Sequence, residues 1–421
     1  MRFAGLSVCL LVASGCGRVA YVAPDAARDA PGGLDATASL DASSGLDASS
    51  GLDASSSADA PSSADAPSSA DAPSSADAPS SADAFASADA FASGDAAPPI
   101  GTYNRMFLSP LVPDAAFGGL AGGDAICASA ARAAGLGGTF IAFLSTTTVD
   151  AIDRLGSAQG WVRPDGRVVA RSQADLVALA SIDYPPSVDA FGVRNPPGGY
   201  GTFTGTRLDG TASSLETCGD WTLATGFGTG GSFDLASYDW HARSGVSCGA
   251  PARLFCMQID HTSAPPTAVP LPGRRIFAAY RPDSSESPDA ACARVGAAIP
   301  GATFHALVAT STSSAAARFT WDRWPIVNTR GLVVAESFTD LSTDGLWTSV
   351  MQVDGSSAIF SMLATGAPSF TDVGTQTCAD WTSASSTLTG AVSLLGYTAQ
   401  HWFSSGSAQC SNPMWFYCLE D

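Results

Sequence analysis

Hydrophobic and polar residues follow the same order twice between residues 101 and 421. In the first copy, NRMFLS at Asn104 and TFIAFLS at Thr139 have the alternation and the residue types of strands. In the second copy, the matching segments are RRIFAA at Arg274 and ATFHALVATS at Ala302. ARLFCMQI and MWFYCLE, near the two ends, predict a last, buried strand in each copy. The chain therefore contains an internal duplication.

Helices are expected early in each copy. A run of small residues from Asp124 to Ala134 predicts a helix that GLGG ends, and Asp289, after Pro288, opens the matching helix. TTVDAIDRLG, residues 147–156, predicts a second helix with its apolar residues on one face. Short strands and glycine-rich loops follow. We therefore expect the fold class α+β, in two tandem domains of about 150 residues each.

Nearly the same six residues, TCGDWT at Thr217 and TCADWT at Thr377, occur once in each copy. The cysteine is either a reactive thiol beside an acid and an aromatic residue, or half of a disulfide beside a core tryptophan. A catalytic cysteine needs a nearby histidine base and a lowered pKa. Eight cysteines divide evenly between the copies and leave no odd thiol, which favours disulfides and an oxidising compartment.

The first 20 residues, MRFAGLSVCLLVASGCGRVA, have the apolar run of a secretory signal, which is too short to span a membrane. Ala13-Ser14-Gly15-Cys16 resembles a bacterial lipobox. That resemblance implies a lipoprotein signal peptide at 1–15 and lipidation, for example with palmitate, at Cys16. The alternative is an ordinary signal peptide cleaved near Gly15. We expect an exported protein that is lipid-anchored to a bacterial envelope membrane, at the outer membrane or cell surface.

Residues 16–100 consist largely of hexapeptide repeats such as LDASSG, ADAPSS and ADAFAS, with Asp at every sixth position from Asp29 to Asp95. The repeats lack the apolar residues that a core requires, so we expect a disordered stalk. A flexible coil of this length has an end-to-end distance of roughly 50 Å. Domain 1 is then 101–262 and domain 2 is 273–421, joined by the proline-rich linker 263–272.

Charge excludes one class of partner. The net charge is −19, most of it in the stalk, and all 20 basic residues are arginine. A basic stripe that would neutralise phosphates is absent, so we expect no nucleic acid partner.

Several segments resemble the endostatin-like domain, the C-terminal non-collagenous domain of certain collagens. CASAARAAGLGGTFIAFLST from Cys127 is similar to its early helix and strand, and WPIVNTRGLVVAESFTDL from Trp324 is similar to its middle segment. SCGAPARLFCMQI and QCSNPMWFYCLE match its closing cysteine pair. The resemblance covers nearly all of residues 101–421, once per copy, and implies a C-type lectin-like fold. It also implies four disulfides, Cys127–Cys256, Cys218–Cys248, Cys292–Cys418 and Cys378–Cys410.

The resemblance does not supply a ligand. The animal domains bind heparan sulfate through basic residues, but where they have a basic residue after GTF, this chain has Ile141 in the first copy and His305 in the second. The zinc-binding histidine cluster and the calcium-dependent sugar motif of true C-type lectins are missing. Histidines 241, 261, 305 and 401 do not share positions between the copies, and Asp209-Gly210 and Asp354-Gly355 predict turns. We expect no catalytic residue, cofactor or metal.

The loop from Asp183 to Gly201 is the candidate ligand surface, because it places aromatic residues and an arginine among prolines and glycines. The alternative is a loop packed on its own domain. We expect a non-enzymatic surface protein that presents two lectin-like modules to a carbohydrate, a cell-wall polymer or an extracellular protein. A hydrolase or other enzyme on this scaffold and a purely structural envelope protein are the alternatives. The candidate ligand residues are Tyr184, Phe191, Arg194 and Tyr200.

Overall fold

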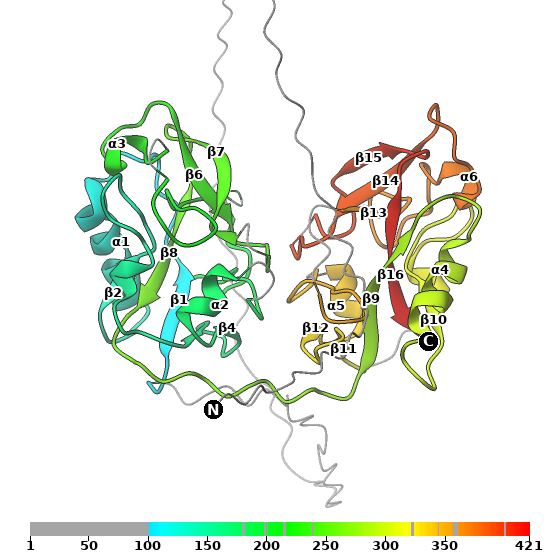
Figure 1. The fold of residues 1–421 in the computed structure, drawn as a ribbon, viewed down its shortest axis with the longest axis horizontal. Helices are drawn as coiled ribbons and strands as arrows, with labels where there is room; N and C mark the ends of the chain where they lie inside the picture. Colours follow the sequence, from blue (N-terminus) through cyan, green and yellow to red (C-terminus); the bar gives the residue numbers. More distant parts are fainter. Residues whose placement is uncertain are drawn as a thin grey trace, which may run out of the picture. The chain divides into compact units, whose positions relative to one another are not determined.

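The computed structural model describes residues 101–421 except 179–181, 198, 200, 214–215, 238–239, 321–323, 344, 357–360 and 400. The expected signal peptide, Cys16 and the stalk lie outside the described residues. The two copies, here called repeat 1 and repeat 2, fall within one compact unit of the chain. Each repeat has its own eight-stranded mixed sheet (Figure 1).

The described elements of repeat 1 run from the first to the last strand of its sheet. They are β1 (Asn104–Leu108), α1 (Gly119–Ala133), β2 (Phe140–Ala142), the 3-10 helix η1 (Asp153–Leu155), β3 (Trp161–Val162), β4 (Val168–Ala170), α2 (Gln173–Val177), β5 (Gly201–Phe203), α3 (Cys218–Trp221), β6 (Phe227–Ser232), β7 (Arg243–Ser247) and β8 (Arg253–Gln258).

Repeat 2 has the same order of elements. They are β9 (Arg274–Arg281), α4 (Pro288–Gly296), β10 (Phe304–Ala306), the 3-10 helix η3 (Ala316–Arg318), β11 (Ile326–Val327), β12 (Val333–Ala335), α5 (Phe338–Thr343), β13 (Met362–Ala364), α6 (Cys378–Trp381), β14 (Thr389–Leu394), β15 (Gly406–Gln409) and β16 (Met414–Glu420).

The two sheets have the same topology. The strand order is β4-β3-β1-β8-β5-β6-β7 in repeat 1 and β12-β11-β9-β16-β13-β14-β15 in repeat 2. The short strands β2 and β10 pair with β8 and β16 in addition. The central pairs are antiparallel and in the same register, since Phe107 faces Cys256 and Phe277 faces Cys418. The expected duplication and the α+β class are confirmed.

The expected helices are only partly correct. Helix α1 begins at Gly119, five residues before Asp124, which does not open it; the Asp124 carboxylate instead binds Arg154. In repeat 2, Ser287 caps α4, with Pro288 as the first helical residue. The second helix expected over 147–156 is wrong, because only the short 3-10 helix η1 forms there.

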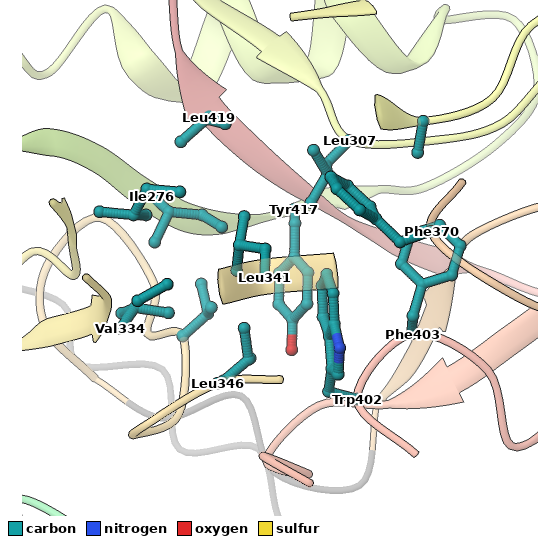
Figure 2. Packing of buried hydrophobic residues seen from close by; sticks show 14 of the residues in the cluster. Ile276, Leu307, Val334, Leu341, Leu346, Phe370, Trp402, Phe403, Tyr417 and Leu419 are labelled. Carbon is teal, nitrogen blue, oxygen red and sulfur yellow. The ribbon is translucent and has the colours of Figure 1, made fainter. Parts of the chain in front are cut away.

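The central strands of each sheet are buried on both faces. In repeat 1, Met106 and Leu108 belong to one apolar cluster and Phe107, between them, belongs to the cluster that packs under α1. Repeat 2 repeats this arrangement with Ile276 and Phe277. The central strands read as continuous apolar runs because a strand covered on both faces has no solvent side. Figure 2 shows one of these clusters, in which Tyr417 of β16 lies among aromatic and aliphatic side chains.

The hydroxyl of Tyr417 is buried in that cluster and has no hydrogen-bond partner among the described residues. Phe255 of repeat 1 holds the matched position, one residue before the β8 cysteine, and carries no hydroxyl. An unsatisfied buried polar group costs about 1–3 kcal/mol. Tyr417→Phe should therefore raise the free energy of unfolding by about 1 kcal/mol, measured by urea unfolding. The opposite exchange, Phe255→Tyr, should lower it; equal stability of Tyr417→Phe and wild type would contradict this explanation.

All eight cysteines of the two repeats form disulfides. The four pairs are those that the resemblance implies: Cys127–Cys256, Cys218–Cys248, Cys292–Cys418 and Cys378–Cys410. Disulfides of this number are typical of proteins in an oxidising environment outside the cytoplasm. Among the described residues, no helix has both the length and the apolar character needed to cross a membrane.

Candidate functional site

The repeated motif forms a left-handed turn. In α3, Cys218, Gly219, Asp220 and Trp221 all have φ between 49° and 66°. The four matched residues of α6, Cys378 to Trp381, have φ between 51° and 68°. For L-residues this conformation costs roughly 1–2 kcal/mol each, so it persists only where the surroundings enforce it.

Three groups of the motif hold this turn in place. The cysteine is bridged, and the indole Nε1–H of Trp221 donates to the carbonyl of Ser145 at 2.7 Å. The carboxylate of Asp220 accepts from both the backbone N–H and the hydroxyl of Thr147, at 2.8 and 2.9 Å.

Repeat 2 has the same contacts: Asp380 accepts from the backbone N–H and the hydroxyl of Ser311, and the indole N–H of Trp381 donates to the carbonyl of Ala309. The bonds from Ser311 lower the pKa of Asp380. The motif therefore ties its turn to the loop after the second strand of each sheet, and neither of the two motif cysteines, Cys218 and Cys378, has a free thiol.

The four residues of the candidate ligand loop do not lie together on one surface. Tyr184 is 1% exposed and its hydroxyl accepts from the backbone N–H of Val333 in repeat 2, at 3.0 Å. Phe191 is 68% exposed, and its own backbone N–H donates to the Asp189 carboxylate. Arg194 reaches repeat 2, and Tyr200 lies outside the described residues. Tyr184 and Arg194 thus belong to the junction between the repeats.

Trp347 of repeat 2 is the centre of that junction. The guanidinium carbons of Arg167 and Arg194 lie 3.6 and 4.0 Å from the centroid of its indole ring. Arg194 also donates to the carbonyl of Leu346 at 3.1 Å. Guanidinium groups at these distances from an indole ring form cation–π contacts, which strengthen as the site is desolvated.

Ion pairs and a backbone bridge extend the junction. Buried Asp183 of repeat 1 pairs with Arg171 at 2.7 Å and with Arg330 of repeat 2 at 2.6 Å. Leu235 and Tyr397, each three residues beyond the matched strands β6 and β14, form an antiparallel bridge with one another. Because matched positions of the two repeats meet there, this part of the junction has local two-fold character.

Removing the Trp347 side chain should weaken this junction. Trp347→Ala deletes both cation–π contacts, each worth about 1 kcal/mol, so the two halves should associate roughly 30-fold more weakly. A protease site placed between Pro266 and Val269 of the linker, cleaved after folding, makes the association measurable by sedimentation, because no disulfide joins the repeats. Phe191→Ala, at an exposed residue of the repeat 1 loop that carries Arg194, is the control. Equal association of the Trp347→Ala and control halves would contradict this role.

A cavity of about 510 Å³ opens beside the junction. Arg194 and Asn195 of repeat 1 line one side, and repeat 2 supplies the remaining described lining. Its volume is in the range of small-molecule sites, about 300–1,000 Å³. The repeat 2 lining combines aromatic rings with hydroxyl groups and small residues, namely Leu341, Ser342, Thr343, Gly345, Trp347, Pro368, Ser369, Phe370, Trp402 and Phe403.

The two predicted turns and the buried His241 are structural. Asp209 and Asp354 each bind the backbone N–H two residues on, as the expected turns require. His241 is fully buried against Trp240, and burial lowers its pKa to about 4. Within the described residues, no three His, Cys, Asp or Glu side chains converge as a metal site would need.

Sequence reasoning missed Trp347, Trp402 and Arg167. The sequence around these residues gives little indication of their place. Nothing in the local pattern distinguishes a tryptophan or arginine at a repeat junction from one elsewhere in the domain. Known proteins add no assignment, since no family model matches the chain and no curated protein has a matching sequence.

Proposed function

We propose that this chain is a non-enzymatic, surface-anchored lipoprotein whose two lectin-like repeats bind a glycan. In this proposal the endostatin-like resemblance describes the fold, and Cys16 carries the lipid. The junction cavity is the binding site, so the two repeats form one composite site. That differs from two independent modules, which would depend on avidity.

The aromatic lining of the junction cavity carries the proposal. Trp347, Phe370, Trp402 and Phe403 line the cavity, the last three with only 3–4% of their surface exposed, while Ser342, Thr343 and Ser369 provide hydroxyl groups close to them. Sugars offer both an apolar ring face and hydroxyl groups, so a site of this mixed character suits them. The bridged cysteines support a binding role over the thiol chemistry that the repeated motif suggested.

Glycan binding is tested with the full mature chain on an array of bacterial cell-wall and capsular glycans. Thr343→Trp places a large side chain in the cavity from an exposed position and should abolish binding. Ser407→Trp, on exposed β15 and outside the cavity, is the matched control and should bind normally. Binding that survives Thr343→Trp would exclude the cavity, and an array without any signal would favour the structural alternative.

The anchor is tested separately. Metabolic labelling with a fatty acid should label the wild-type chain, and Cys16→Ala should remove the label and release the protein from membranes, because the acyl chains then have no attachment point. An unlabelled wild type would leave the ordinary secretory signal as the explanation of the N-terminal sequence.

A further inference from the structure

Arg105 on β1 and Arg275 on β9 hold the same position in the two sheets. Each backbone N–H donates to the side chain at the end of the last strand of its sheet. Arg105 N donates to Gln258 Oε1 at 3.1 Å, and Arg275 N donates to Glu420 Oε2 at 2.9 Å. The two sites therefore have the same backbone hydrogen bond. They differ in the group that accepts it, which is an amide in repeat 1 and a carboxylate in repeat 2.

In repeat 2 the carboxylate neutralises the arginine. Arg275 Nε donates to Glu420 Oε2 at 2.7 Å and Nη2 donates to Oε1 at 2.6 Å, a bidentate pair. This planar fork-to-carboxylate geometry is the strong form of an arginine contact.

In repeat 1 the arginine has no such partner. Gln258 uses its amide nitrogen on Asp260, at 2.9 Å. Arg105 Nη1 donates to the carbonyl of Arg163 at 3.2 Å, and no carboxylate lies within ion-pair distance of Arg105 among the described residues. Arg105 is only 6% exposed. A buried cation without a counter-charge is costly, so this guanidinium is suited to an anion from outside.

Arg105 lines a cavity of about 390 Å³ together with Gln258, Asp260, His261 and the glycines before β2. At the matched place in repeat 2, a cavity of about 510 Å³ is lined by Arg275 and Glu420. The Asp260 carboxylate accepts from Thr139 N at 2.7 Å and lies in the wall of the repeat 1 cavity. It can accept from a ligand hydroxyl, and it repels doubly charged anions.

We infer that the cavity beside Arg105 binds a small hydroxylated carboxylate, such as a uronic acid. Its carboxylate pairs with the Arg105 guanidinium from the cavity side, as Glu420 pairs with Arg275 in repeat 2, and its hydroxyl groups face Asp260. The site has one cation and one anion, so it favours a singly charged carboxylate over sulfate or phosphate. It lies within repeat 1 and does not depend on the junction cavity.

Isothermal titration of the full mature chain with glucuronate tests this site. Wild type should bind one equivalent with a Kd on the order of 1 mM, while glucose and inorganic sulfate should not compete. Gln258→Glu supplies the missing carboxylate internally and should weaken binding about tenfold or more. Glu420→Gln frees Arg275 and should raise the stoichiometry towards two.

The outcomes separate this site from its alternatives. Unchanged binding by Gln258→Glu, or equal competition by glucose or sulfate, would overturn the inference, as would the absence of any glucuronate binding to wild type. If circular dichroism shows that Gln258→Glu does not fold, Glu420→Gln is the deciding variant. A stoichiometry that stays at one would then overturn the inference. Thr343→Trp should leave glucuronate binding intact, so failure of the junction site and failure of this one are distinguishable.

Discussion

Replacing Cys127 and Cys256 together by alanine should lower the free energy of unfolding of repeat 1 by about 5 kcal/mol. The bridge joins α1 to β8 across 129 positions of sequence, so it closes most of the domain. In the chain-entropy account, such a cross-link stabilises by restricting the unfolded chain, and more so for a longer loop. The loss is comparable to the whole stability of many domains, so repeat 1 should unfold near physiological temperature.

The inner bridge gives the matched comparison. Cys218 and Cys248 are 30 positions apart, so their replacement should cost less, about 4 kcal/mol. Repeat 2 offers an internal replicate, because Cys292–Cys418 spans 126 positions and Cys378–Cys410 spans 32. Urea unfolding of the four double variants gives the order. An inner-bridge loss that exceeds the outer-bridge loss in both repeats would contradict the loop-length explanation.

Acid should destabilise repeat 1 through His241. Burial lowers the pKa of this imidazole from 6.5 to about 4, while backbone groups of Arg207 and Leu208 and the Asp209 carboxylate act in the opposite direction. Between these two pH values the unfolded chain binds a proton that the folded chain does not. Stability should therefore be complete above pH 6.5 and should fall by about 3 kcal/mol as the pH drops to about 4.

Repeat 2 again supplies the control. Phe403 follows Trp402 as His241 follows Trp240, so His241→Phe introduces the residue that the fold already accommodates at the matched position. His241→Phe should flatten the dependence of unfolding free energy on pH between about 6.5 and 4. Phe403→His should make the unfolding free energy depend more steeply on pH over the same range. Parallel pH profiles for wild type and His241→Phe would show that the buried imidazole is not the acid-sensitive group.

The strands and the duplication could be predicted because they depend on local pattern. The central strands read as apolar runs, and each has a matched partner in the other copy. The helix predicted over 147–156 does not form, because its residues make other hydrogen bonds, one of them to a distant part of the chain. The hydroxyl of Ser145 accepts from Ala151 N at 2.9 Å, and Asp150 binds Ala212 N, 62 positions away, at 2.7 Å. Side chains that satisfy the backbone in this way compete with a helix.

The start of α1 was missed for a related reason. Glycines at 119, 122 and 123 argue against a helix by propensity. A Cβ at Gly122 would lie 1.8 Å from the Phe117 carbonyl oxygen, and one at Gly123 would lie 2.8 Å from Leu144. Close packing of this first turn needs glycine, and that need is visible only once the neighbours are in place.

The sequence by itself determined the duplication, the α+β class and the even division of cysteines between the repeats. These follow from periodicity and counting along one chain. Only the tertiary structure decided that Tyr184 meets Val333, 149 positions away, that two arginines enclose Trp347, and that Arg105 lacks the carboxylate that Arg275 has. Such relations arise when paired strands and folded loops bring distant residues together, so local spacing does not encode them.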